Sequence, residues 1–283
     1  PKGDFAYLTE YAGDIFFGYH IHENYLFFNF NLSEKYRGAH QIEYLKQPDV
    51  DEFKKWNEAS GGYVKMVSYA SELDEAYRFT EYLKNENITP SLAHSAASYE
   101  IIQESVKKGV SCITHTYNAQ SPLHHREIGV VGSAMLFDEL NAELIADTIH
   151  VSVPAIRLLV KNKPLDKLTL ITDAMRAKGI ADGESELGGQ VVIVKNGEAR
   201  LTNGTLAGSV LRMNRAIENM VKKVGVPFTQ AVDYATINPA KNLKIDDIAG
   251  SIKVGKNADF AVIDGETYDV IYTVRAGKVV YQR

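Results

Sequence analysis

Histidine and aspartate side chains stand at the ends of short apolar runs along the chain. His94, His115, His150 and Asp173 each close such a run, and 21 residues, about one strand–helix repeat, separate His94 from His115. Successive parallel strands place such side chains on one rim of a sheet, the rim on which α/β barrels build active sites. Imidazole and carboxylate groups suit a zinc-like ion with an open position for water. The pattern therefore favours metal-assisted hydrolysis, with Asp173 moving protons.

A single histidine at a strand end is more often an ordinary polar residue than a ligand. Four chemically suitable residues at successive strand ends favour the functional interpretation. A further pair, His20 and His22, is spaced by two, so both imidazoles would point to one face of a strand. Taken alone the pair is a weak signal, but it precedes the repeats, as a metal pair on a first barrel strand would.

The segment from residue 115 to 127 is rich in hydrogen-bond donors. Within it, Arg126 is flanked by His124 and His125 and would suit a phosphate or carboxylate ligand. The alternative is a solvated loop in which Arg126 makes a surface ion pair. The residue types leave both interpretations open.

The elements that must position these residues alternate between strand and helix from about residue 63 to 180. Gly109, for example, supplies a stop after a helical stretch at 98–108 in which apolar residues repeat four apart. This alternation predicts a parallel sheet covered by helices. Five units are visible and a closed barrel needs eight, so the remainder must precede residue 63. The expected strands are 63–69, 89–94, 110–115, 142–147 and 167–173.

The pattern changes after Asp173. The run 190–201 predicts two strands joined by a turn at Asn196-Gly197, since both residues tolerate positive φ. Helices are expected at about 209–224 and 228–243, and short strands in a tail from residue 250, whereas 25–31 fits no element. We expect a barrel domain at 14–185 and 203–245 and a small β-sandwich from 1–13, 186–202 and 246–283.

Composition excludes several classes of protein. The 283 residues are 45% hydrophobic with a net charge of −5, which argues against disorder and against a basic surface for nucleic acid. No run approaches the roughly 18 apolar residues of a membrane span. The single cysteine, Cys112, fits a reducing compartment. We therefore expect a cytoplasmic protein with neither nucleic-acid nor membrane partners.

Several ordered motifs carry a specific resemblance. From about residue 32 to the C-terminus the chain resembles the N-acetylglucosamine-6-phosphate deacetylases of the amidohydrolase superfamily. The last motif resembles the closing segment of that superfamily's small β-sandwich. The motifs are 93–100, 114–119, 122–127, 129–132, 145–150, 171–175, 204–209, 238–240 and 255–259.

The resemblance implies a (β/α)8 TIM-like metal-dependent hydrolase barrel with a small appended β-sandwich. It also implies hydrolysis of N-acetylglucosamine 6-phosphate to glucosamine 6-phosphate and acetate. One or two divalent ions are implied, with zinc expected and iron, manganese or cobalt as alternatives. The phosphate-binding arginine of this family comes from a neighbouring subunit, so a homodimer is implied.

The resemblance also assigns roles to residues. It makes Asp173 the acid/base and has His40 help to polarise the acetyl carbonyl. The metal ligands would be His94 and His115, together with the pair His20 and His22. The groups that bind the sugar phosphate would be Asn118, Ala119, Arg126 and His150.

One departure from the family is large. Its metal-binding Glu would fall at position 28, which is Phe28, and the nearest upstream carboxylate is Glu23. We therefore expect that barrel strands two and three are absent from this sequence. Ala93, Gln120 and Ile128 are smaller departures that remove no ligand.

Two other functions stay open. One is another amidohydrolase reaction, such as cyclic-amide hydrolysis or deamination, although the context of Arg126 argues against it. The other is an inactive homologue that only binds amino-sugar phosphates, an alternative supported by the missing Glu alone.

Overall fold

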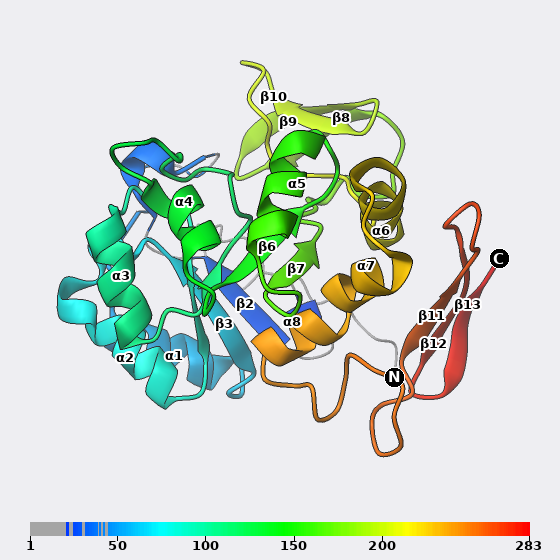
Figure 1. Ribbon diagram of the computed structural model, residues 1–283, viewed down its shortest axis with the longest axis horizontal. Coiled ribbons are helices and arrows are strands. Elements are labelled where there is room, and N and C mark those ends of the chain that lie inside the picture. Colours follow the sequence, from blue (N-terminus) through cyan, green and yellow to red (C-terminus); the bar gives the residue numbers. More distant parts are fainter. Residues whose placement is uncertain (1–20, 23–24, 30–31, 39, 41, 43–44) are drawn as a thin grey trace. The chain divides into compact units, whose positions relative to one another are not determined.

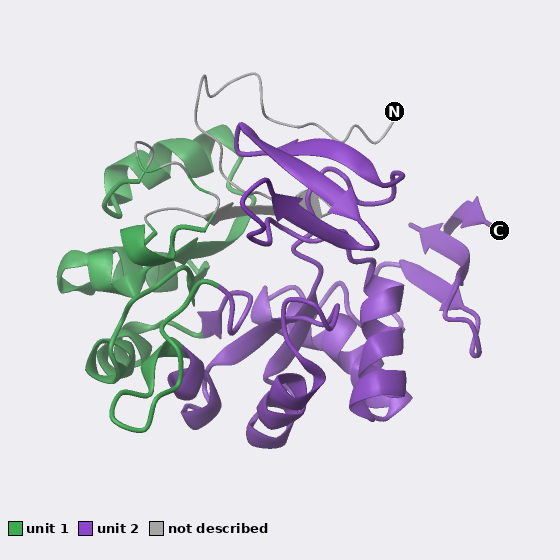
Figure 2. Cartoon of the chain, turned by 90° about the horizontal axis from the view of Figure 1, so that it is seen from above, with its two compact units in different colours: residues 1–111, 119–130 green, residues 112–118, 131–283 purple. Residues whose placement is uncertain are grey.

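The computed structural model describes residues 21–22, 25–29, 32–38, 40, 42 and 45–283 (Figure 1). The chain divides into two compact units, coloured separately in Figure 2. The first comprises Pro1–Ser111 and Ala119–Val130, and the second Cys112–Asn118 and Val131–Arg283. The expected division into a barrel and a β-sandwich domain stays a prediction.

The first unit contains three parallel strands. Strand β2 pairs with β3 and β3 with β4, both in parallel, while the short β1 runs antiparallel to β2. The segment 25–29, which the sequence left unassigned, therefore forms a strand beside β3. The strands are β1 (Ile21–His22), β2 (Tyr25–Asn29), β3 (Val64–Tyr69) and β4 (Thr89–Leu92). The α-helices are α1 (Val50–Ala59), α2 (Arg78–Asn85) and α3 (Tyr99–Lys108), and short 3₁₀ turns are η1 (Glu34–Tyr36), η3 (Ser71–Leu73) and η4 (Glu75–Tyr77).

The second unit repeats this arrangement and adds antiparallel sheets. Its parallel strands are β5 (Cys112–Ile113), β6 (Asn141–Ile145) and β7 (Leu168–Ile171), paired in that order. The helices are α4 (Gly129–Leu136, most of it in this unit), α5 (Val153–Asn162), α6 (Met213–Asn219), the π-helical η5 (Met220–Val224), α7 (Phe228–Ala235) and α8 (Ile237–Asn242). The antiparallel strands are β8 (Gly183–Leu187), β9 (Gln190–Lys195), β10 (Glu198–Leu201), β11 (Phe260–Ile263), β12 (Val270–Arg275) and β13 (Lys278–Gln282).

Burial explains why the parallel strands lack alternation. Every residue of β6 is buried, as are five of the six residues of β3. A strand that is covered on both faces has no solvent-facing side, so its sequence need not alternate between apolar and polar residues. The five predicted strands are confirmed. Each strand has between one and four residues fewer than predicted.

An aromatic cluster fixes α1 and α2 against the first unit's sheet. The ring of Phe79 meets those of Phe53 and Tyr69 edge to face, with centroids 5.6 and 5.3 Å apart. The Tyr69 hydroxyl also hydrogen-bonds Thr80. The buried carboxylate of Asp74 accepts the backbone N–H groups of Phe79 and Thr80 at 2.9 and 2.8 Å, so it caps the first turn of α2.

The two predicted helices near the C-terminus differ in detail from the structure. The first begins at Met213 rather than near residue 209 and ends in the π turn of η5. The second is interrupted at Thr236, where φ is −132° and ψ is −81°. Pro239 has no N–H and its ring would collide with the carbonyl of Ala235, four residues earlier, so one helix cannot run through both. The predicted hairpin is confirmed, with φ of 53° at Asn196 and 80° at Gly197.

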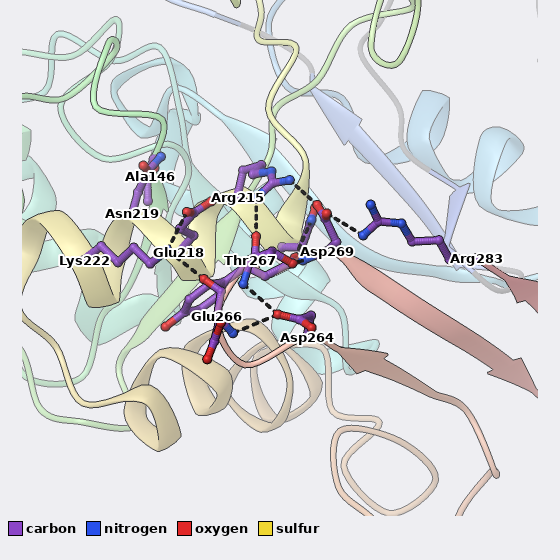
Figure 3. Close-up of polar contacts among 12 residues, drawn as sticks. Ala146, Arg215, Glu218, Asn219, Lys222, Asp264, Glu266, Thr267, Asp269 and Arg283 are labelled. Carbon is purple, nitrogen blue, oxygen red and sulfur yellow. Dashed lines mark hydrogen bonds and ion pairs between the residues drawn. The ribbon is translucent and has the colours of Figure 1, made fainter.

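The loop between β11 and β12 is tied to α6 and η5 within the second unit (Figure 3). Arg215 donates to the carbonyl oxygen of Thr267 at 2.7 Å and pairs with Asp269, whose other oxygen pairs with Arg283 at 2.6 Å. Lys222 donates to the carbonyl oxygen of Glu266 at 2.9 Å. These contacts fasten the C-terminal sheet to the helical layer. Among the helices described, none is both long and apolar enough to cross a membrane.

Candidate active site

Three of the predicted site residues share one backbone geometry. His94, His115 and Asp173 each lie two residues beyond the last residue of β4, β5 and β7, respectively. Their φ angles are 44°, 35° and 46°, in the left-handed region that side-chain-bearing residues rarely adopt. Such strain persists where the surrounding structure imposes it, and it concentrates at functional sites.

In the first unit, the ring of His94 is held in one tautomer. Its Nδ1 lies 2.6 Å from the carbonyl oxygen of Tyr36. A carbonyl oxygen can only accept, so Nδ1 carries the proton and the lone pair is on Nε2. Gly38 makes this approach feasible, because a Cβ at that position would lie 3.1 Å from Cε1 of His94. The structure thus leaves Nε2 of His94 as the nitrogen that could bind a ligand.

His40 lies against His94 in the same unit. The two rings meet edge to face with centroids 5.3 Å apart, and Arg37 donates to the carbonyl oxygen of His40. Two of the predicted histidines thus lie in ring contact. The role of His40 at an acetyl carbonyl stays a prediction.

In the second unit, His115 interacts with Asp173 and His150. The His115 side chain is buried, and burial lowers its pKa, while the charge of Asp173 acts in the opposite direction and that of His150 in the same direction. A histidine in this setting is neutral, which is the form that binds metals. The second unit thus brings three predicted residues within electrostatic range of one another.

His150 is oriented by a carboxylate that the sequence interpretation missed. Its Nδ1 lies 2.6 Å from Oδ2 of Asp147, while Oδ1 accepts the backbone N–H groups of Ile149 and His150 at 2.8 Å each. Burial opposes ionisation of Asp147, but these hydrogen bonds prevail and hold its pKa below the usual value. An Asp three residues before a candidate His was the available signal.

A second carboxylate that sequence reasoning missed lies inside the sheet. Glu143 occupies the middle of β6 and is 7% exposed. Burial raises the pKa of Glu143 to about 8, and the charge of Asp173 acts in the same direction. Its backbone carbonyl accepts the N–H of Thr116 at 2.7 Å. The signal was a lone acidic residue within an apolar run.

The motif 204–209 supports Asp173. Ser209 donates its N–H to the carbonyl oxygen of Asp173 at 2.9 Å and its hydroxyl to that of Thr172, and its carbonyl oxygen accepts the N–H of Met175 at 2.9 Å. Gly208, with φ of 67°, packs so closely that a Cβ would lie 3.1 Å from Cβ of Met175. This motif fixes the strained backbone on both sides of Asp173.

The remaining predicted substrate-binding residues lie in turns. Asn118 donates its backbone N–H and its Nδ2 to the carbonyl oxygen of His115, at 2.9 and 3.1 Å, and Ala119 has a φ of 48°. Arg126 lies on an exposed loop before α4, where its guanidinium contacts His125. Their roles with substrate stay predictions.

Only part of the predicted metal site lies among the described residues. Within them, no three His, Cys, Asp or Glu side chains form a group that could hold a metal ion. His20 lies outside the described residues, and for His22 only the strand is described. An imidazole protonated on Nδ1, as in His94, and a neutral imidazole, as in His115, are each the kind of donor that a divalent ion takes.

Comparison with known proteins decides the family. The model of the amidohydrolase family matches residues 5–280, nearly the whole sequence. The chain belongs to the amidohydrolase family. The resemblance noted in the motifs is thereby confirmed at the level of the family.

Individual relatives of this amidohydrolase carry deacetylase names. The N-acetylglucosamine-6-phosphate deacetylase of Bacillus subtilis (strain 168) is 41% identical over 250 residues, covering 88% of this chain and 63% of the relative. The N-acetylgalactosamine-6-phosphate deacetylase of Escherichia coli O157:H7 is 35% identical over 228 residues, covering 81% and 60%. The chain thus spans less than two thirds of the length of these relatives.

A solved structure supports the fold. A mutant of N-acetyl-D-glucosamine-6-phosphate deacetylase from Mycobacterium smegmatis, in complex with N-acetyl-D-glucosamine-6-phosphate, matches with a TM-score of 0.83 at 32% identity. The match covers 88% of this chain and 66% of that one. Together with the parallel strands and separate antiparallel sheets, it confirms the predicted α/β barrel with an appended β unit.

Proposed function

We propose that this amidohydrolase removes the acetyl group of N-acetylglucosamine 6-phosphate, releasing acetate and glucosamine 6-phosphate. The single observation that carries the proposal is the shared left-handed backbone of His94, His115 and Asp173 just beyond three strand ends. Local strain at three chemically suitable residues is what a preorganised site requires. The names of the relatives give the substrate class.

We assign His94 and His115 as ligands of a divalent ion, with His20 and His22 as further ligands for one or two ions. Zinc is the first choice, and iron, manganese or cobalt are the alternatives. The tautomer of His94 and the burial of His115 support this assignment. When bound, the ion would supply a Lewis acid that polarises the acetyl carbonyl and makes a water molecule more acidic.

Asp173 is the group that moves protons. Its carboxylate would accept a proton from the attacking water and then return it to the amine that leaves. Ser209 holds the backbone of Asp173, so the carboxylate needs little rearrangement. His40 would donate a hydrogen bond to the acetyl oxygen as negative charge develops there.

The phosphate group would be bound by Arg126 and His150, with contacts from Asn118 and Ala119. Within the part of the chain that the structure describes, Arg126 forms no ion pair with a carboxylate, so its charge is available to an anion. Asp147 holds the His150 ring in one orientation. Arginine suits this role because its planar donors match phosphate oxygens.

We propose that the protein is a homodimer in which Arg126 of each subunit binds the phosphate group in the active site of the partner subunit. A cytoplasmic location is supported by the single cysteine, Cys112, which is buried and cannot form a disulfide within the chain. We also retain the division into a barrel (14–185 and 203–245) and a β-sandwich (1–13, 186–202 and 246–283).

The experiment combines metal analysis with acetate release. Purified protein is assayed with N-acetylglucosamine 6-phosphate, its galactosamine epimer and unphosphorylated N-acetylglucosamine, and bound metal is measured. His94→Ala and His115→Ala should lose metal and activity together with unchanged helical content, whereas His124→Ala should keep metal. Full metal occupancy in either of the first two variants would contradict their assignment.

The substrate panel separates the alternatives. Acetate release from the phosphorylated sugars alone supports the proposal, and the two epimers establish which sugar is preferred. Binding of the sugar phosphate without acetate release would identify an inactive homologue. Activity only on cyclic amides or aminated rings would identify a different amidohydrolase reaction.

A further inference from the structure

The tip of the loop that carries Arg126 is a tight two-residue turn. His124 and Glu127 exchange both backbone hydrogen bonds, each 3.1 Å long, so His125 and Arg126 form the corner. The N–H of Arg126 also donates to Nδ1 of His124 at 3.2 Å. The backbone at Arg126 is therefore fixed although the residue is exposed.

The carboxylate next to Arg126 is turned away from it. Oε1 of Glu127 accepts the N–H of Tyr99, the first residue of α3, at 3.1 Å and that of Gly129, the first residue of α4, at 2.9 Å. These two hydrogen bonds to helix N-termini hold the carboxylate where it stands. Glu127 thus anchors the loop without neutralising the neighbouring guanidinium.

The guanidinium instead contacts an imidazole. A terminal nitrogen of Arg126 lies 2.7 Å from Nε2 of His125. Arginine has only donors, so Nε2 must accept and the proton of His125 must be on Nδ1. A neutral acceptor restricts the side chain without cancelling its charge, and it leaves the other donors of the guanidinium for a ligand.

We propose that His125 is a positioning residue, which holds the Arg126 guanidinium ready for the phosphate monoester of the substrate while Glu127 is kept away from it. The inference rests on the proposed function, because it specifies how the phosphate is recognised. A carboxylate in place of His125 would compete with the phosphate for the same donors. The hydrogen bond from Arg126 to imidazole removes rotamer freedom before binding, which improves affinity.

The test compares His125→Ala with His125→Gln, because glutamine retains a neutral acceptor. We expect His125→Ala to raise KM for the 6-phosphate substrate about tenfold, which corresponds to one hydrogen bond of about 1.4 kcal/mol. Its kcat should stay unchanged, as should kcat/KM for unphosphorylated substrate. His125→Gln should recover most of the affinity. Leu123→Ala, an exposed change on the same loop, is the matched control.

A second readout is independent of turnover. Binding of inorganic phosphate, followed by thermal stabilisation of the metal-loaded protein, should weaken in His125→Ala and Arg126→Ala but not in Leu123→Ala. If Arg126→Ala weakens phosphate binding and His125→Ala does not, the positioning role is wrong while the proposed function stands. If Arg126→Ala has no effect, the phosphate assignment of the proposed function fails. Equal losses on phosphorylated and unphosphorylated substrates would also overturn the positioning role.

Discussion

At the scale of the residue, Asp173 is the decisive position. An aspartate at a strand end can serve as the cap of a following helix, but no helix follows Asp173, and Ala174 instead forms a β-bridge with Ser209. The carboxylate therefore does not serve as a cap. Its negative charge instead acts on His115 and Glu143, in the direction that raises the pKa of both.

We expect Asp173→Asn to abolish proton transfer and little else. Asparagine keeps the size but cannot accept a proton from water, so kcat should fall by about 10²–10⁴-fold. Asparagine also tolerates a φ of 46°, so the free energy of unfolding should change by less than about 1 kcal/mol. Steady-state kinetics and urea denaturation check both parts. Near-normal turnover would remove Asp173 from the mechanism.

The buried amine of Lys163 should make the stability of the protein depend on pH. Lys163 is 6% exposed and donates to the carbonyl oxygen of Phe137 at 2.8 Å, and burial lowers its pKa from 10.5 to about 8. Between these pKa values the unfolded chain holds more protons than the folded chain, so stability rises with pH. Below pH 8 the folded state carries the full cost of a buried charge.

Lys163→Met removes this titration. The free energy of unfolding of the variant, relative to that of the wild type, should be highest below pH 8. This difference should fall by roughly 2–3 kcal/mol as the pH approaches 10.5, because the wild type gains stability over that range. Urea unfolding of both proteins at several pH values from 7 to 10 measures the difference. A difference that does not vary with pH would show that Lys163 stays charged in the folded protein.

At the scale of the element, the start of α2 depends on one carboxylate. Asp74 is buried and accepts three hydrogen bonds, from two backbone N–H groups and the Thr80 hydroxyl. Asp74→Ala should therefore lower the free energy of unfolding by about 2–4 kcal/mol, because it leaves these donors without an acceptor. Urea denaturation gives the value.

The neighbouring carboxylate is the matched control. Glu75 pairs with Arg78 at 2.9 Å, but both side chains are largely exposed. Glu75→Ala should change stability by less than about 0.5 kcal/mol, because exposed ion pairs contribute little. Similar losses in the two variants would contradict the capping role of Asp74.

The way in which a strand or helix is buried determines whether its sequence pattern predicts it. The strands from β3 to β7 were found because each is an apolar run that ends in polar residues. The segment 25–29 was missed because its aromatic and aliphatic residues follow one another without alternation, and a parallel strand inside a sheet has none. The break at Thr236 needed the geometry of Pro239, which a periodic pattern does not reveal.

The site likewise contains residues that the sequence predicts and residues that only the structure reveals. His94, His115 and Asp173 were identifiable because strand ends imply a shared rim. Asp147 acts by hydrogen bonds on His150, Glu143 by charge on Asp173, and Ser209 by hydrogen bonds on the backbone of Asp173. These contacts depend on tertiary packing. Similarly, the orientation of Glu127 toward two helix N-termini has no counterpart in residue spacing.

At the scale of the whole molecule, the proposed sharing of Arg126 between subunits makes a quantitative prediction. In the proposed dimer, each active site uses Asp173 of one subunit and Arg126 of the partner subunit. Arg126→Ala and Asp173→Asn therefore remove residues that different subunits supply to one site. When the two variants are mixed and allowed to exchange subunits, half of the dimers are mixed, and each mixed dimer has one complete site. About a quarter of wild-type activity should return at low substrate concentration.

The control for this experiment is mixing without exchange. The same variants, combined immediately before the assay, should show only the average of their separate activities. If prolonged mixing also gives only that average, Arg126 acts within its own subunit or not at all. Light scattering on the unmixed proteins establishes whether dimers are present.

The left-handed backbone at His94, His115 and Asp173 has an evolutionary consequence. Each position holds a side chain where glycine would fit with less strain, of the order of 1–2 kcal/mol per residue. Selection for thermal stability alone would thus replace these three residues early. A lineage released from its reaction would become more robust as it lost its chemistry, so ancestral or consensus redesign of this chain should exempt these positions.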